Sequence, residues 1–334
     1  MVYILVLNWN NWDATRDCLE ALLKQDYPDY KIILPDNGSA DFLTVEKNVK
    51  KWAFEAGAGF ISYTRHEAES GGRPEEKAKG PGTERPFLVF IQNGENLGYA
   101  GGNNVGLRYA LKKNDFEYVW LLNNDTVPEE SALSALVSCA QKNQAAMAGS
   151  KLLYADAPEK EKPKNLQMAG GGMIWPAAGN AFIMGAGRKD DGQWDKPFPL
   201  DYVCGASLLV KKEVLFKVGL LEEKYFLYWE DVEWGIRAGR NGFKRLYCPD
   251  SRVLHKEGGT IGKAEGGISG KADYYWVRNG LYFTKKYYPW YLPVVLAAYL
   301  AKHTAIRILK RQPLNFRAFV SGLFDFLAGK TGPA

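Results

Sequence analysis

Cysteine is scarce in this 334-residue chain, and no two of its four cysteines lie close together. Cys18, Cys139, Cys204 and Cys248 are too widely spaced to form a CxxC redox pair or a zinc knuckle. We therefore expect reduced thiols and no structural disulfide, as in a cytosolic protein. Histidine is rarer still, at three residues, so any histidine that binds a metal or a phosphate must come from very few positions.

Targeting and membrane-spanning signals are also missing. The apolar N-terminus, 1–7, has no basic leader and no small-residue cleavage site, so we interpret it as a buried first strand and not as a signal peptide. The longest apolar run, 290–301, is shorter than the roughly 20 residues of an ordinary membrane span and is interrupted by Pro293.

The charge is unevenly distributed along the chain. The net charge is +5, yet residues 285–330 alone carry eight Lys or Arg and one Asp, so the rest of the chain has a net charge of −2. A slightly acidic body argues against nucleic-acid binding. The apolar and basic tail suits either a helix lying on an anionic membrane surface or a helix that docks on the catalytic domain.

The first 150 residues alternate between strand-like and helix-like segments. We expect strands at 2–7, 31–34, 87–91 and 118–122, and helices at 13–24, 45–56, 102–113 and 129–142, the last opened by Pro128. Such an alternation is typical of an α/β fold with a parallel, doubly wound sheet. Ligands bind such sheets at the carboxyl ends of the strands. Polar residues follow the expected strands there, at Asn8, Asp36 and 123–125.

The remaining segments are more mixed. Residues 64–86 are rich in Gly, Glu, Lys and Arg and predict an exposed, mobile excursion, and 155–164 predicts a polar loop. Further along we expect a strand at 204–210, a helix near 212–218, a helix from about Glu230 and an aromatic helix at 274–288.

Two motifs suit a nucleotide. Asp36-Asn37-Gly38-Ser39 can bind a base or ribose through its carboxylate, although it is also ordinary turn chemistry. The Asn- and Gly-rich run 96–106 opens an expected helix, whose N-terminus favours a diphosphate. This run lacks the GxGxxG and P-loop patterns, which disfavours a dehydrogenase or an NTPase.

A metal site is indicated by Asp125, with Asn123 as a neutral second ligand, because hard cations prefer oxygen ligands. The same residues would also serve as a helix N-cap before Pro128. His255 is the one histidine positioned to assist in binding metal or phosphate, although a single histidine is more often structural.

Acidic residues cluster at Glu230, Asp231 and Glu233, beside Tyr228 and Trp229. Like charges so close together raise one another's pKa, and such a carboxylate can act as a general base toward a hydroxyl group. Acidic residues also complement the dipole of a helix N-terminus, and both roles are compatible.

Taken in order, these motifs resemble the inverting family 2 glycosyltransferases of the GT-A fold, in particular their rhamnosyltransferase-like branch. The resemblance covers about residues 1–280 and includes Asn8-Trp9-Asn10, Asp36–Ser39, 96–106, 122–125, Cys204-Gly205-Ala206, 229–231, His255 and 275–279. It implies a Rossmann-like sheet flanked by helices and a C-terminal helical tail.

The resemblance also implies a role for each motif. Asp231 would be the catalytic base with Glu230 beside it, and Asp125 and His255 would hold Mn²⁺ or Mg²⁺. The nucleotide sugar would be bound by Asn8, Asn10, Asp36, Asn96, Gly98, Asn103, Asn104 and Asn123. The sugar and acceptor pocket would be lined by Cys204, Gly205, Ala206 and Trp229. Two departures are the single acid in Asn123-Asn124-Asp125 and the length of the 64–86 excursion.

The implied function is transfer of a sugar, with dTDP-rhamnose the favoured donor, to a polysaccharide or lipid-linked acceptor at the cytoplasmic face of a membrane. Residues 1–150 would bind the donor, with 64–86 as an exposed insertion, 151–280 would bind the acceptor, and 281–334 would form the basic tail. One alternative is a non-catalytic membrane-surface scaffold on a degenerate GT-A fold. Another is a nucleotidyltransferase, disfavoured because 6–10 contain no Lys, Arg or Gly for a triphosphate.

Overall fold

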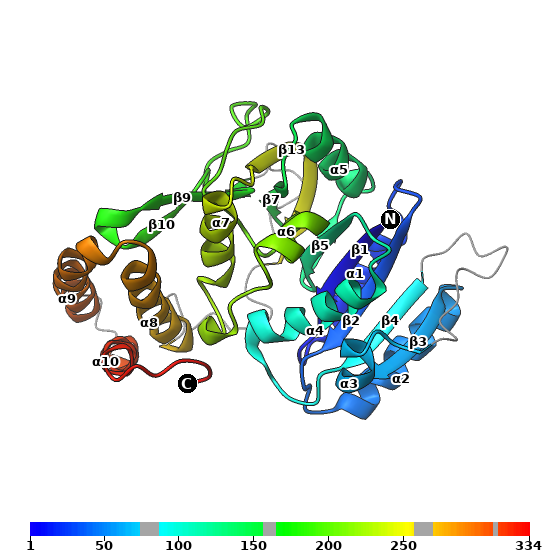
Figure 1. The fold of residues 1–334 in the computed structure, drawn as a ribbon, viewed down its shortest axis with the longest axis horizontal. Coiled ribbons are helices and arrows are strands. Elements are labelled where there is room, and N and C mark those ends of the chain that lie inside the picture. The colour runs from blue at the N-terminus through cyan, green and yellow to red at the C-terminus, as the bar shows by residue number, and fades with distance from the viewer. Residues whose placement is uncertain (74–86, 156–164, 257–269, 310–312) are drawn as a thin grey trace.

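The computed structural model describes residues 1–73, 87–155, 165–256, 270–309 and 313–334, and its main feature is a large mixed sheet with helices on both faces (Figure 1). Strands follow one another across this sheet in the order β3 (Gly59–Thr64), β4 (Phe87–Gln92), β2 (Tyr30–Asp36), β1 (Val2–Leu7), β5 (Tyr118–Asn123), β12 (Ser207–Lys211), β7 (Met147–Tyr154), β13 (Arg245–His255) and β6 (Thr126–Pro128), with β8 (Leu166–Ala169) beside β7.

The half of the sheet from β3 to β5 is parallel, as the alternating sequence predicted. Strand β12 is antiparallel to both of its neighbours, and β13 is parallel to β7. The mixed α/β class is therefore confirmed. The carboxyl ends of β1, β2 and β5 lie together at one edge, where the predicted polar motifs follow each strand.

Strand β1 shows why the sheet is covered on both faces. Val2, Ile4 and Val6 point into one core, and Tyr3 and Leu5 point into the other, because successive side chains of a strand alternate. The first core is closed by α1 (Trp12–Leu22), α2 (Phe42–Glu55) and α5 (Ala132–Lys142). The second is closed by α3 (Arg65–Glu69), α4 (Gly98–Lys113), α6 (Lys212–Lys217) and α7 (Glu230–Arg240).

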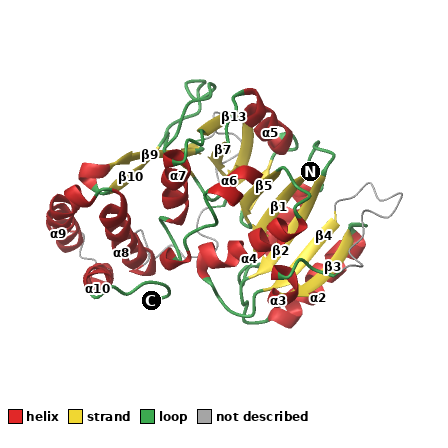
Figure 2. Cartoon of the chain, viewed as in Figure 1, coloured by secondary structure: helices red, strands yellow, loops and turns green. Residues whose placement is uncertain are grey.

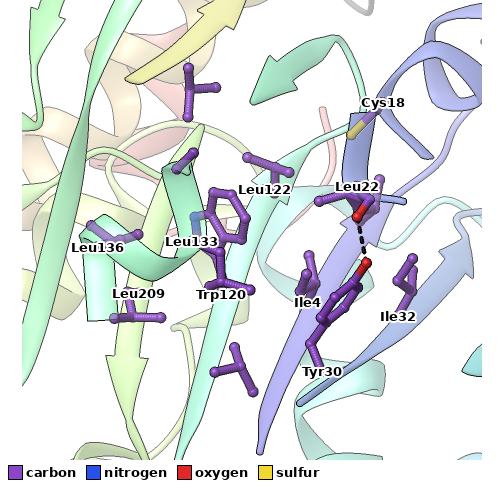
Figure 3. Packing of buried hydrophobic residues seen from close by; sticks show 14 of the residues in the cluster. Ile4, Cys18, Leu22, Tyr30, Ile32, Trp120, Leu122, Leu133, Leu136 and Leu209 are labelled. Carbon is purple, nitrogen blue, oxygen red and sulfur yellow. Dashed lines mark hydrogen bonds between the residues drawn. The ribbon is translucent and has the colours of Figure 1, made fainter. Parts of the chain in front are cut away.

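Aromatic and aliphatic side chains fill the first core densely (Figure 3). Trp120 of β5 lies among residues of α5, and its indole donates to Ser207 of β12 at 2.9 Å. Tyr30 donates its hydroxyl to the Leu22 carbonyl at the end of α1, at 2.5 Å. Buried polar groups of this core are thus paired while the apolar surface is removed from water.

A smaller sheet and three helices form the other end of the molecule (Figure 2). The strands are β10 (Asn180–Ile183), β9 (Gly171–Trp175) and β11 (Tyr202–Val203), and the helices are α8 (Gly270–Tyr287), α9 (Leu292–Leu309) and α10 (Pro313–Leu327). Short 3₁₀ turns lie at η1 (Pro176–Ala178), η2 (Glu223–Tyr225) and η3 (Pro289–Tyr291). Among the described helices, none combines the length and apolar character needed to cross a bilayer.

Several expectations about elements were wrong. Residues 59–64 form an edge strand and 65–69 a helix with a Thr64–Glu67 capping box, so the start of the expected excursion is ordered. The rest of the excursion, 74–86, lies outside the described residues, and so do residues 156–164 of the expected polar loop. Pro128 ends β6 and does not open a helix, since α5 begins at Ala132. The apolar run 290–301 is divided next to Pro293, as expected: η3 ends at Tyr291, and Pro293 lies in the first turn of α9, where proline is tolerated.

The expectation of four reduced thiols was also wrong. Cys139 of α5 and Cys248 of β13 form a disulfide across 109 residues of sequence, while Cys18 and Cys204 are free. Sequence spacing could not reveal this pair, because the two cysteines meet only through the tertiary packing of α5 on β13.

Candidate active site

A chain of side-chain hydrogen bonds connects the carboxyl ends of the three central strands. Asn124, after β5, donates to Thr15 at 2.9 Å, and Thr15 donates to Oδ1 of Asn8, after β1, at 2.7 Å. Asn8 in turn donates to Oδ2 of Asp36, at the end of β2, at 3.0 Å. All four residues are buried, so these hydrogen bonds fix the ends of the three strands relative to one another.

Asp36 therefore lies where the sequence suggested, yet both of its oxygens already accept hydrogen bonds, from Asn8 and from the backbone amide of Ser39. Asn8 is fully buried, and its side-chain amide forms hydrogen bonds with Asp36, Ser39 and Thr15. These two residues shape the loop after β2. Asn10 is more exposed and has a left-handed backbone, with φ of 54°, and accepts a hydrogen bond from Ala40.

The Asn- and Gly-rich run lies at the start of α4, which begins at Gly98 and not at the expected residue 102. Asn96 accepts hydrogen bonds from Asn37 and from the Gly98 amide. Asn103 bonds back to the Tyr99 carbonyl, and Asn104 is buried and joined to Leu221 and Glu223. The asparagines of this run thus build the loop and tie it to η2.

Asp125 and His255 are brought together by the pairing of β6 with β13. His255 lies opposite Thr126, and Nε2 of His255 is 3.1 Å from Oδ1 of Asp125. The other ring nitrogen, Nδ1, is 2.7 Å from Oε1 of Gln167 on β8. A carbonyl oxygen on the second ring nitrogen is the usual partner of a metal-binding histidine. Sequence reasoning missed Gln167, because no nearby pattern indicates it.

This pair could hold a divalent cation with help from a ligand. Within the described ranges, no three His, Cys, Asp or Glu side chains gather into one metal-binding group. Mg²⁺ and similar ions are commonly held by one or two protein groups together with water and substrate phosphates. Asn124 points away into the buried Thr15 network, so Asn123 is the remaining neutral oxygen donor in the motif.

The acidic pair lies at the start of α7. Asp231 is half-buried, and its carboxylate accepts hydrogen bonds from the backbone amides of Gly205 at 3.0 Å and Val232 at 2.8 Å. Burial raises its pKa above the ordinary value of an aspartate. Glu230 is buried, and its Oε2 has no hydrogen-bond partner among the residues that the structure describes. Burial together with the charge of Asp231 raises its pKa strongly. Burial therefore disfavours the ionised form of both carboxyl groups, and the charge of Asp231 adds to this effect at Glu230.

The segment Cys204-Gly205-Ala206 leads into β12, which begins at Ser207 and not at the expected residue 204. Ala206 accepts a backbone hydrogen bond from Asn123 at 3.1 Å, and Gly205 bonds to Asp231, so this segment bridges the ends of β5 and α7. Burial raises the pKa of the Cys204 thiol to about 12, which excludes a thiolate nucleophile at neutral pH.

The remaining predicted residue, Trp229, is buried and donates its indole N–H to the Trp276 carbonyl at 3.1 Å. Its ring packs against Trp276 and Phe283 of α8. Trp229 thus anchors the start of α7 on the C-terminal helices. A contact with sugar would require movement of this ring, whereas Tyr228 beside it is only half-buried.

Comparison with known proteins defines the class. The family model "Glycosyltransferase like family 2" matches residues 81–265, more than half of the chain. The chain therefore belongs to glycosyltransferase family 2 and is an enzyme of the glycosyltransferase class.

Curated relatives share this class at low identity. The chain is 25% identical over 171 residues to "Low-salt glycan biosynthesis hexosyltransferase Agl10" of Haloferax volcanii, covering 51% of this chain and 52% of that protein. It is 25% identical over 257 residues to "dTDP-rhamnosyl transferase RfbF" of Shigella flexneri, covering 75% and 81%. It is 37% identical over 65 residues to an N-acetylglucosaminyl-diphospho-decaprenol L-rhamnosyltransferase of Mycobacterium tuberculosis, covering 20% of this chain and 21% of that protein. The chain thus spans about half of the first of these relatives, and a smaller part of the last.

Solved structures share the GT-A fold. The mannosyltransferase PcManGT from Pyrobaculum calidifontis, in complex with GDP-Man and Mn²⁺, superposes with a TM-score of 0.53 at 14% identity, covering 98% of this chain and 86% of that one. GalNAc-T7 with UDP, GalNAc and Mn²⁺ superposes with a TM-score of 0.56 at 15% identity, covering 83% and 47%. At such identities the likeness concerns the fold alone.

Proposed function

We propose that this glycosyltransferase moves a sugar from a nucleoside diphosphate to an acceptor hydroxyl with inversion at the anomeric carbon. The observation that carries the proposal is the backbone path between Asp125 and Asp231. Asn123, two residues before Asp125, bonds to Ala206, and the neighbouring Gly205 bonds to Asp231. A group that can hold a diphosphate and a group that can accept a proton therefore border the same strand ends, as single displacement requires.

Asp125 and His255 are proposed to hold a divalent cation, with Gln167 orienting the imidazole. A carboxylate oxygen and an imidazole nitrogen form a suitable partial donor set for Mn²⁺ or Mg²⁺, which the diphosphate oxygens would complete. The bound ion would neutralise charge on the departing diphosphate. Both superposed structures named above were solved with Mn²⁺ and a nucleotide or nucleotide sugar, which supports this proposal for the present chain.

Asp231 is proposed to be the general base. Its carboxylate accepts the proton of the acceptor hydroxyl while that oxygen forms a bond to the anomeric carbon, and the bond from this carbon to the diphosphate oxygen breaks on the opposite face. The two backbone amides that bind Asp231 fix its orientation. Burial and the charge of Asp231 raise the pKa of Glu230, which disfavours a second negative charge beside the base.

The relatives support a proposal for the substrate classes. RfbF is named a dTDP-rhamnosyl transferase and the M. tuberculosis relative an L-rhamnosyltransferase with a lipid-diphosphate acceptor, which favours dTDP-rhamnose as donor and a polysaccharide or lipid-linked acceptor. Residues 1–150 would bind the donor and 151–280 the acceptor. Asp36, Asn10 and Asn96 are proposed to border the nucleotide, and Cys204 through Ala206 the sugar.

Melting curves test the donor site. Nucleoside diphosphates and their sugars are added one by one, with and without Mn²⁺, and a ligand at a hundred times its dissociation constant should stabilise the protein by roughly 2.7 kcal/mol. We expect a metal-dependent shift with the thymidine compounds. The anomeric configuration of the product, measured by NMR, then tests inversion. Absence of any shift with every nucleotide would contradict the donor site, and a retained configuration would contradict single displacement.

A peripheral contact with an anionic membrane at the cytoplasmic face is proposed for the tail. Trp290 is 92% exposed, and Tyr291, Val294, Phe324 and Leu327 are also exposed, while Val295 and Phe319 of the same helices are buried against α8. The basic composition of 285–330 adds attraction to anionic lipid. Flotation with phosphatidylglycerol vesicles should fall when Trp290 and Phe324 are replaced by serine. Equal flotation of variant and wild type would contradict this contact.

A further inference from the structure

The segment immediately before the acidic pair has an unusual backbone. Phe226, Tyr228 and Trp229 have φ values of 61°, 63° and 76°. Residues with a Cβ rarely adopt positive φ, and aromatic residues do so only when their surroundings impose it. We call residues 225–229 the left-handed loop. Contacts with residues outside the loop must stabilise this backbone conformation.

Asn279 of α8 supplies that support. Its side chain is fully buried, and Nδ2 lies 2.7 Å from the Tyr225 carbonyl, 2.8 Å from that of Leu227 and 3.0 Å from that of Tyr228. The two N–H groups of this amide are thus shared among three backbone carbonyls of the left-handed loop, and the Tyr225 carbonyl also accepts a hydrogen bond from the Leu227 amide at 2.7 Å. Buried carbonyls without a donor are costly, so this conformation depends on Asn279.

The orientation of that amide is set by its neighbour. Arg278, also buried, donates from Nε to Oδ1 of Asn279 at 3.1 Å, which turns Nδ2 toward the loop. Arg278 is itself held, because its other nitrogens donate to the Tyr274 hydroxyl at 3.0 Å and to the Gly332 carbonyl at 2.7 Å. The amide therefore cannot rotate without breaking a chain of bonds to the C-terminal segment.

The left-handed loop also forms hydrogen bonds on its other side, with the half of the protein that is proposed to bind the nucleotide sugar. The Tyr99 amide, in the first turn of α4, donates to the Phe226 carbonyl at 2.7 Å. The Tyr99 hydroxyl donates to the Gly205 carbonyl at 2.7 Å, and the Gly205 amide binds Asp231. These hydrogen bonds connect the left-handed loop through Tyr99 of α4 and Gly205 to Asp231. They leave the loop few alternative positions.

We propose that Asn279 is a positioning residue that sets the orientation of Asp231 through the left-handed loop, without contacting substrate. This inference rests on the proposed role of Asp231 as the base. A small displacement of a reacting group can lower the rate about 100-fold, so loss of this support should act on turnover.

Asn279→Asp tests the proposal, because it keeps the size of the side chain and replaces the donor nitrogen with an oxygen. We expect kcat to fall by about 10- to 100-fold with a smaller change in KM for the nucleotide sugar, since the Asp125–His255 pair makes no contact with Asn279 in the bonds that hold the loop. Amide hydrogen exchange over 225–232 should become faster. The control is Asn241→Asp at the far end of α7, where an exposed side-chain amide donates to the Arg237 carbonyl, and both readouts should match wild type.

A rescue experiment separates positioning from general instability. Asn279→Ala removes the donor, and Tyr228→Gly in the same chain introduces a residue that adopts positive φ without penalty. We expect the double variant to recover kcat several-fold over Asn279→Ala. If Asn279→Asp does not fold, Asn279→Ser retains one hydroxyl donor and carries the same measurements.

Unchanged kcat and unchanged exchange over 225–232 in a folded Asn279 variant would overturn the inference. So would a fall in kcat with no recovery on adding Tyr228→Gly and no faster exchange. Failure of the base assignment is seen separately, as full turnover by Asp231→Asn. The hydrogen-exchange measurement does not depend on enzymatic activity. It therefore shows whether Asn279 stabilises the left-handed loop, whether or not Asp231 is the base.

Discussion

The backbone amide of Gly205 donates a hydrogen bond to Oδ2 of Asp231 over 3.0 Å. This bond joins the segment before β12, at the centre of the main sheet, to the first turn of α7, which packs on the smaller sheet and α8. The carboxylate is therefore fixed by main chain on one side, while the half-buried side chain remains accessible.

Replacement of the base should remove turnover and leave the fold intact. We expect Asp231→Asn to lower kcat by about 10²- to 10⁴-fold, the usual contribution of a general base. In the wild type, burial raises the pKa of Asp231, and the base is active only when deprotonated, so kcat should decline on acidification at a pH above the range of an ordinary aspartate. Steady-state rates from pH 4 to 9 measure this decline. Near-normal turnover by Asp231→Asn would show that another group accepts the proton.

Glu230 should cost stability at neutral pH. Its pKa is raised in the folded protein, so the folded state retains a proton that the unfolded state releases, and stability falls as pH rises from the unfolded pKa through the folded one. Glu230→Gln should therefore melt higher than wild type at pH 8, and the difference should vanish at acid pH. Asp325→Asn is the opposite control, because bonds from Tyr274 and Lys330 lower the pKa of Asp325 and its loss should destabilise at pH 8. A Glu230→Gln protein that melts lower than wild type at pH 8 contradicts the assignment.

Metal binding should depend on two residues directly and on a third indirectly. Asp125→Asn and His255→Ala should each abolish the Mn²⁺-dependent part of the nucleotide-induced shift in melting temperature. Gln167→Ala should weaken Mn²⁺ affinity by about 10- to 100-fold, because it only orients the imidazole. Calorimetric titration with Mn²⁺ and nucleoside diphosphate checks all three. Wild-type affinity in His255→Ala would remove His255 from the site.

The disulfide should contribute measurably to stability. Cys139–Cys248 closes a loop of 109 residues, and bonds that close long loops typically stabilise by about 2–4 kcal/mol. Urea unfolding with and without dithiothreitol should differ by this amount in wild type. The Cys139→Ala/Cys248→Ala variant is the control and should not respond to reductant. Equal stability of oxidised and reduced wild type would mean that packing of α5 on β13 suffices.

Gly98 should tolerate no side chain. Its φ is 72°, and an added Cβ would lie 2.2 Å from the Phe226 carbonyl oxygen, in the left-handed loop. Gly98→Ala should destabilise by about 1–3 kcal/mol through overpacking and should also lower kcat, because it displaces that loop. Gly94→Ala separates the two causes, since Gly94 has a similar φ of 81° but nothing within 4 Å of its Cβ position. Equal effects of both substitutions on stability and kcat would contradict the role of the contact.

Local pattern was sufficient for much of the fold. The alternation of apolar residues in 2–7 and the helical spacing in 13–24 predict β1 and α1, because periodicity within one segment records which side chains must be buried. The positions of Asp36 and Asp125 after apolar strands likewise follow from short-range pattern, since parallel strands end at a common edge. These residues and the acidic pair at 230–231 could thus be selected as candidates from the sequence.

What each candidate contacts was decided only by tertiary structure. Asn10 is exposed, whereas Asn104 is buried and forms a hydrogen bond with Glu223. No local sequence pattern distinguishes the surroundings of these two asparagines. The proximity of His255 to Asp125 depends on the pairing of β6 with β13, 130 residues apart in the chain. The hold of Asn279 on the left-handed loop and the Cys139–Cys248 bond are equally non-local. Sequence determined which segments must be buried and which groups carry chemistry, whereas packing between distant segments determined which of those groups meet.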